Sequence, residues 1–101
     1  MKPGADILLR LSAQQALLGA VTPNLRSYSA EIDGELITCQ AVFEEAPTAE
    51  EIDLIQIVGT LIIADFRDEK LEEQFVVNAN RTMPKALTYL IYQRHEPPET
   101  P

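Results

Sequence analysis

A tight turn between two alternating segments is the feature that most constrains the fold. Asp33-Gly34 is a preferred pair for a two-residue type I′ hairpin turn, because both central positions of that turn need a positive φ. Closure around this pair places Ile32 opposite Glu35, Ala30 opposite Ile37, Tyr28 opposite Cys39 and Arg26 opposite Ala41. One face of the predicted hairpin is then almost entirely apolar: Tyr28, Ala30, Ile32, Ile37, Cys39, Ala41 and Phe43.

The opposite face of this hairpin is mostly polar. It consists of Ser27, Ser29, Glu31, Leu36, Thr38 and Gln40. A register slip of one residue would exchange the two faces, so their clean separation supports the pairing. We therefore expect a sheet with one buried face and one face in contact with water.

Two capping motifs predict a helix on either side of the hairpin. Ser12-Ala13-Gln14-Gln15 and Thr48-Ala49-Glu50-Glu51 both have the pattern of a capping box. The first helix ends at Thr22-Pro23-Asn24, and its start, at Ser12 or as early as Asp6, stays open. The second helix, of about 18 residues, carries a helical apolar stripe. The stripe consists of Ile52, Ile55, Val58, Ile62 and Phe66, and its widening by Leu54, Leu61 and Ile63 predicts a helix packed deeply on a sheet.

Two further strand-like runs complete the predicted domain. Apolar and polar residues alternate over 71–77, and a second run covers 87–94 after an irregular loop that contains Pro84. The order α-β-β-α-β-β favours an α+β two-layer sandwich, in which two helices cover one face of a four-stranded antiparallel sheet. We predict a single domain over 1–95 and a flexible, proline-rich tail over 96–101.

The overall charge excludes several classes of partner. The 101 residues include 16 Asp and Glu against 8 Lys and Arg, which gives a net charge of -8. Such a chain repels phosphate backbones, so we expect no nucleic-acid binding. The longest nearly uncharged apolar stretch, 54–64, is shorter than the ~20 residues that cross a bilayer, so we expect no membrane association. One cysteine cannot form an internal disulfide, and the cytoplasm is the expected location.

The sequence offers little for catalysis. The single histidine, His95, stands next to the predicted tail, and Cys39 falls on the apolar face of the hairpin. One Cys and one His cannot build a zinc tetrad, and the four glycines are isolated rather than grouped in a nucleotide-binding loop. We therefore expect a protein without catalytic residues, metal ligands or cofactor.

Acidic residues are concentrated in the middle of the chain. Thirteen of the 16 fall within residues 31–73. Ten of these thirteen are candidates for docking a basic protein by complementary charge, although a solvated face is the ordinary use of such residues. The ends of the second helix, about 27 Å apart at 1.5 Å per residue, separate the candidates into two groups. The N-terminal acidic group is Glu44, Glu45, Glu50, Glu51 and Asp53, and the C-terminal acidic group is Asp65, Asp68, Glu69, Glu72 and Glu73.

Five segments of the chain form a familiar pattern: Leu11–Gly19, Glu31–Gly34, Thr48–Glu51, Ile63–Phe66 and Tyr89–Tyr92. This pattern resembles that of small bacterial immunity proteins from contact-dependent growth inhibition and related polymorphic-toxin systems. The similarity runs from about residue 9 to about residue 95. It implies a cytoplasmic protein, with no catalysis and no cofactor, that binds a cognate toxin domain and covers its active site. Many such toxins are basic nucleases acting on tRNA or DNA.

Two alternatives stay open at this point. A small adaptor or homo-oligomeric subunit would associate through apolar residues on the open sheet face, such as Leu36 and Val42. An enzyme would use two or more of the clustered carboxylates with a divalent ion, although the chain lacks the alternating ligands and turn glycine of a calcium loop.

Overall fold

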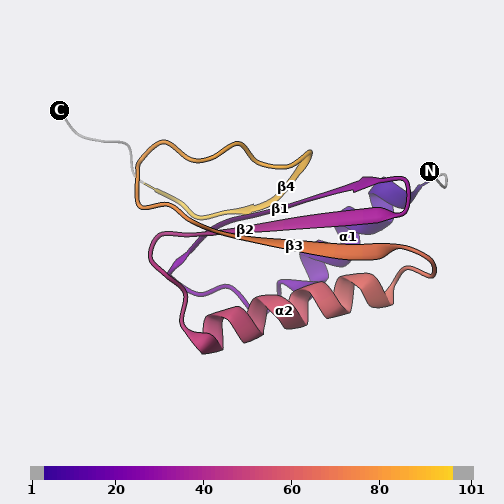
Figure 1. Ribbon diagram of the computed structural model, residues 1–101, viewed down its shortest axis with the longest axis horizontal. Helices are drawn as coiled ribbons and strands as arrows, with labels where there is room; N and C mark the ends of the chain where they lie inside the picture. Colours follow the sequence, from indigo (N-terminus) through magenta and orange to yellow (C-terminus); the bar gives the residue numbers. More distant parts are fainter. Residues whose placement is uncertain (1–3, 97–101) are drawn as a thin grey trace.

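The computed structural model describes residues 4–96, which form two helices and one four-stranded sheet (Figure 1). In chain order the elements are α1 (Ala5–Ala16), β1 (Leu25–Asp33), β2 (Leu36–Phe43), α2 (Ala49–Ala64), β3 (Lys70–Val77) and β4 (Tyr89–Gln93). The strands lie in the order β3-β2-β1-β4. The predicted α+β class, with two helices and a four-stranded sheet, is confirmed.

The prediction of an antiparallel sheet is wrong at β3, which pairs parallel to β2. The helix α2 joins these two strands, and a connecting helix of this kind returns the chain to the end of the sheet where β2 began. β3 therefore starts beside Leu36 and keeps an unbroken register up to the pairing of Phe43 with Val77. β4 pairs antiparallel with β1 at the other edge, so the sheet is mixed and its strands are not in chain order.

The hairpin turn lies one residue later than predicted. Gly34 and Glu35 are its central residues, and Asp33 pairs with Leu36. Gly34 has a φ of 61° whereas Glu35 has no positive φ, which is the pattern of a type II′ turn rather than type I′. The partners of Ile32, Ala30 and Tyr28 are thereby displaced by two residues, and a displacement of two keeps these side chains on their predicted face.

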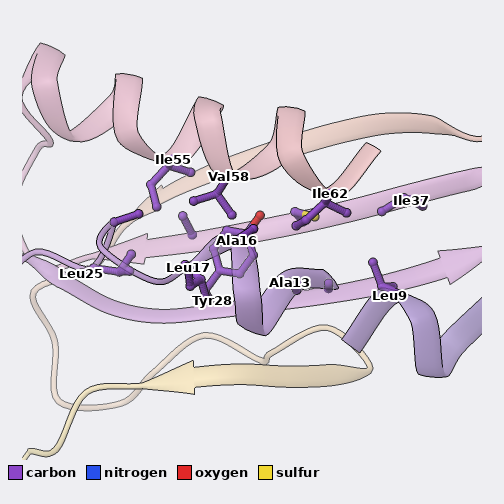
Figure 2. Close-up of a cluster of buried hydrophobic side chains, with 14 of the residues drawn as sticks. Leu9, Ala13, Ala16, Leu17, Leu25, Tyr28, Ile37, Ile55, Val58 and Ile62 are labelled. Atoms are coloured by element: carbon purple, nitrogen blue, oxygen red, sulfur yellow. The ribbon is translucent and has the colours of Figure 1, made fainter. Parts of the chain in front are cut away.

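The apolar face of the hairpin forms the core together with the two helices. Figure 2 shows Leu9 and Ala13 of α1 and Val58 and Ile62 of α2 directed into the layer that also contains Tyr28 of β1. All five side chains are essentially inaccessible to solvent. Full burial of an aliphatic side chain contributes about 1.5–3 kcal/mol, so this layer is the main source of stability.

The two predicted capping boxes have different outcomes. Thr48 caps α2 as predicted: its hydroxyl accepts from the Glu51 N–H at 3.1 Å, and the Glu51 carboxylate accepts from the Thr48 N–H at 2.8 Å. The prediction at Ser12 is wrong, since α1 begins at Ala5 and continues past it. Ser12 is buried inside the helix, where its hydroxyl donates to the Asp65 carboxylate at 2.6 Å.

The second face of the sheet is covered, contrary to the prediction that it contacts water. The connection from β3 to β4, residues 78–88, crosses it from one edge to the other, and we call this segment the crossover (Figure 1). The Leu87 N–H donates to the Ser29 hydroxyl at 3.1 Å. Val42, expected on an open face for self-association, is buried, whereas Leu36 stays exposed. The buried polar side chains on this face are Ser27, Ser29, Thr38 and Gln40.

A bulge in β1 directs Arg26 toward the crossover. The register passes from Leu25 opposite Phe43 to Ser27 opposite Val42, so Arg26 is not opposite Ala41 as predicted. The buried Arg26 guanidinium donates to the Asn78 and Asn80 carbonyls at 2.7 and 2.6 Å.

The same guanidinium holds the end of the described chain. Arg26 forms an ion pair with Glu96 at 2.7 Å, and Arg94 lies 3.1 Å from the same carboxylate. The hydrogen bonds from Arg26 lower the pKa of Glu96 to about 2. Glu96, predicted to open the tail, is thus tied to the domain, and the remaining predicted tail, residues 97–101, lies outside the described residues.

Candidate functional site

Two members of the N-terminal acidic group hold local structure together. Besides capping α2, the Glu51 carboxylate accepts from the Thr22 hydroxyl at 3.0 Å and from the Asn24 amide at 3.3 Å. Its pKa is lowered, chiefly by the hydrogen bond from the Thr48 backbone. Glu44 pairs with Arg94 at 2.7 Å. Both carboxylates are therefore already bound within the chain, Glu51 by uncharged donors and Glu44 by a cation.

The other three members of this group have exposed side chains. Glu45 is fixed by its backbone, whose N–H and carbonyl both bond the Asn24 side chain, while its own side chain is exposed. Glu50 and Asp53 lie on the exposed side of α2 in its first two turns. Within residues 4–96, none of these three carboxylates has a hydrogen-bond or ion-pair partner. They are the members of this group best placed to meet a partner.

The C-terminal acidic group gathers around the turn from α2 into β3. Asp65 ends α2 and binds Ser12 of α1, which joins the two helices at this end. The Glu69 carboxylate accepts from the Asp68 N–H at 3.1 Å, and Glu72 is exposed on β3. Four of the five members of this group thus stand at or near the surface, close to one another in the chain.

Glu73, the fifth member, turns into the interior. It lies opposite Cys39 in the sheet, and its carboxylate fits against Gly59 of α2, where an added Cβ would come within 2.8 Å of Oε1. The other oxygen, Oε2, is buried and has no hydrogen-bond partner among the described residues, and burial raises the pKa of Glu73. This carboxyl group is therefore a weaker candidate for docking than its neighbours.

Cys39 lies in the same interior region. Burial raises the pKa of its thiol to about 11, and burial likewise raises the pKa of the nearby Tyr28 hydroxyl. A thiol of such high pKa is protonated near neutral pH and is a poor nucleophile. The prediction that Cys39 behaves as a small buried hydrophobe is confirmed by its 2% exposure.

The outer surface of the helix pair carries apolar side chains that the sequence pattern did not identify as exposed. The bond from Ser12 to Asp65 and the bond from Thr22 to Glu51 show that α1 and α2 run antiparallel. Along their junction lie five exposed residues, and we call this set the apolar seam. It consists of Leu8, Leu11, Leu18, Ile57 and Leu61.

Helix geometry sets the order of residues along the apolar seam. Because the helices are antiparallel, Leu11, which precedes Ser12, and Leu61, one turn before Asp65, lie on opposite sides of the bonded pair. Ile57 lies a further turn along α2, level with Leu18 beyond the end of α1. The sequence assigned Leu61 to a widened buried stripe, but its side chain is 50% exposed. The stripe is wider than a single buried helix face requires, and this excess width was the sequence signal for exposed apolar residues on α2.

An open pocket of about 320 Å³ lies at one end of the apolar seam, between the start of α1 and the turn after α2. Its lining combines the apolar side chains of Leu8 and Phe66 with the charged residues Asp65, Arg67 and Glu69. This combination suits a side chain with an aliphatic stem and a charged end.

A grouping of metal ligands and a helix able to span a membrane are both absent from residues 4–96. Among them, no three His, Cys, Asp or Glu side chains are grouped so as to hold a metal ion. Neither α1 nor α2 has the length and apolar character needed to cross a bilayer. His95 is exposed.

Comparison with known families identifies the class of protein. Residues 6–96, which include almost all of both helices and the whole sheet, match the family model of an immunity protein of a toxin system. The family is MafI2 immunity protein, and the chain belongs to it. This confirms the resemblance to immunity proteins. Among curated protein sequences, no significant match was found.

Proposed function

We propose that this chain acts in the bacterial cytoplasm, where it binds the toxin domain that it has to neutralise and performs no catalysis itself. The observation that carries the proposal is the match of the MafI2 immunity protein family over residues 6–96. Membership of this family implies a toxin-neutralising function and a cognate toxin as partner. We place the pair in a contact-dependent growth inhibition or related polymorphic-toxin system.

We propose further that the toxin is a basic nuclease recognised through acidic surface. The net charge of -8 supports this choice, as do the exposed carboxylates of Glu45, Glu50 and Asp53, which have no partner within residues 4–96. Complementary charge raises association rates and rejects wrong partners, and carboxylates can occupy a site made for phosphates without being substrates. The immunity protein would then cover the active site of the nuclease.

Calorimetric titration against the toxin domain encoded beside the gene tests this proposal. At low salt we expect nanomolar binding and loss of nuclease activity, and at high salt weaker binding, because salt screens exposed charges. If a folded toxin domain does not bind, the proposed function is wrong. Tight binding that salt does not change would support the inhibitor function and would contradict recognition through acidic residues.

A pair of charge-reversal variants locates the effect on the molecule. Glu50→Lys combined with Asp53→Lys should slow association about tenfold at low salt, since both carboxylates are exposed and have no partner among the described residues. Asp33→Lys combined with Glu35→Lys makes the same change in net charge at the hairpin turn and should have a much smaller effect. Equal effects of the two pairs would mean that only the total charge matters.

A further inference from the structure

We propose that the toxin domain docks on the outer surface of the helix pair, with the apolar seam at the centre of the interface. This inference rests on the proposed function and specifies the surface that performs it. The alternative surface is the opposite side of the molecule, where the crossover covers the sheet (Figure 1).

The first support is the concentration of exposed apolar side chains on this surface. The five residues of the apolar seam are between 41% and 81% exposed, and they come from α1, from the turn that follows it and from α2. Contiguous apolar surface on a soluble protein marks an interaction site, and the fully buried centre of an interface is more apolar than its rim. If the five seam positions served only to form the fold, polar residues with high helix propensity would serve there equally well.

The second support is the charge at the two ends of the apolar seam. Glu50 and Asp53 stand on α2 beyond Ile57, and Asp65 stands at the opposite end, beside the pocket. The only basic residue in α1 and α2 is Arg10, and its guanidinium lies over the ring of Tyr89 at 5.4 Å, toward β4. The surface is therefore apolar in the middle and acidic at the Glu50 end, whereas the pocket end carries both signs, with Arg67 beside Asp65 and Glu69.

This distribution of charge selects the occupant. With a net charge of -8, the chain is repelled by a second copy of itself and by an anionic membrane. A protein surface with an apolar centre bordered by basic side chains is complementary to it, and the pocket beside Asp65 can receive one such side chain. The cognate toxin domain is the partner that the family implies, so we assign this surface to it.

Substitutions that leave the net charge unchanged test the assignment separately from electrostatic recognition. Ile57→Gln and Leu61→Gln remove apolar contact area from exposed positions on α2 and should leave the fold intact, as a thermal melt would show. We expect the double variant to bind the toxin domain at least about tenfold more weakly by calorimetry, because central apolar contacts dominate interface energies. Leu90→Gln is the matched control: Leu90 is 48% exposed, and it lies opposite Ser29, on the side of the crossover. Its affinity should stay within about twofold of the parent.

The possible outcomes separate the surface from the function. Parent-like binding by the helix variant would overturn the proposed surface while the inhibitor stands, and weaker binding by Leu90→Gln alone would move the interface to the crossover side. If the parent chain itself fails to bind a folded toxin domain, the proposed function fails first. Sedimentation experiments test for self-association. If the parent chain forms dimers and the α2 substitutions dissociate them, the surface would belong to a second copy instead.

Discussion

The two faces of the sheet are covered by different kinds of structure. On one face, α1 and α2 bury a continuous apolar layer that includes Leu9, Tyr28 and Ile62. On the other, an irregular crossover lies over small polar side chains and is held by hydrogen bonds to Arg26 and Ser29. Apolar burial needs no particular partner, whereas each polar contact depends on one donor meeting one acceptor. The helix side therefore specifies the fold, and the crossover side depends on a few residues.

Substitution of Arg26 should destabilise the crossover side more than substitution of Arg94 or Ser29. Arg26→Met removes bonds to two carbonyls and to Glu96, and we expect unfolding in urea to show a loss of about 3 kcal/mol, since breaking a buried ion pair costs this much. Arg94→Met is the control: Arg94 has pairs that are partly exposed, so it should lose less than about 1 kcal/mol. Equal losses for the two variants would show that burial of Arg26 adds nothing.

Adjacent residues of β1 offer a smaller and more direct contrast. Ala30→Ser would place a hydroxyl in the apolar layer and should cost about 2 kcal/mol, the desolvation penalty of an unpartnered polar group. Ser29→Ala removes the acceptor for the Leu87 N–H and should cost about 1 kcal/mol. Urea unfolding measures both, and a larger cost for Ser29→Ala would contradict the different roles of the two faces.

The pH dependence of stability should have opposite signs for two glutamates. The pKa of Glu96 is lowered to about 2, so its contribution is present above the ordinary value of 4.5 and is lost as the pH falls toward 2. The pKa of Glu73 is raised by burial, so its ionisation costs stability once the pH rises above 4.5. At neutral pH, Glu96→Gln should lower the thermal midpoint and Glu73→Gln should raise it, both by less than Arg26→Met changes it. Midpoints that move in the same direction would contradict these environments.

Side-chain periodicity made the helix side predictable from the sequence. The predicted partner of Tyr28 was two residues from the observed one, yet every residue of the apolar face was assigned correctly because a strand repeats every two residues. The cap at Thr48 was equally clear, because the signal is contained in four consecutive residues. At Ser12 the same local pattern misled, because its hydroxyl is used by Asp65, 53 residues away.

The features that the sequence did not reveal depend on long-range pairing. The parallel direction of β3 follows from the route of α2 across the sheet, and alternation within β3 is the same for either direction. The burial of Ser27 and Gln40 depends on a crossover with no periodic pattern. Among the candidate docking residues, charge alone could not separate Glu73, which turns inward, from Glu72, which is exposed. The exposure of Ile57 and Leu61 could not be predicted without knowing where α1 lies beside α2.

The most direct test of toxin docking on the helix side is methyl cross-saturation by NMR in the complex with the toxin domain. Saturation of the toxin should attenuate the methyl signals of Ile57 and Leu61 on α2 and of Leu8 and Leu11 on α1, all of them exposed in the free chain. The signal of Leu90 on the crossover side should be unaffected. Attenuation of Leu90 with no change at Ile57 and Leu61 would contradict the assignment of the interface to the helix pair.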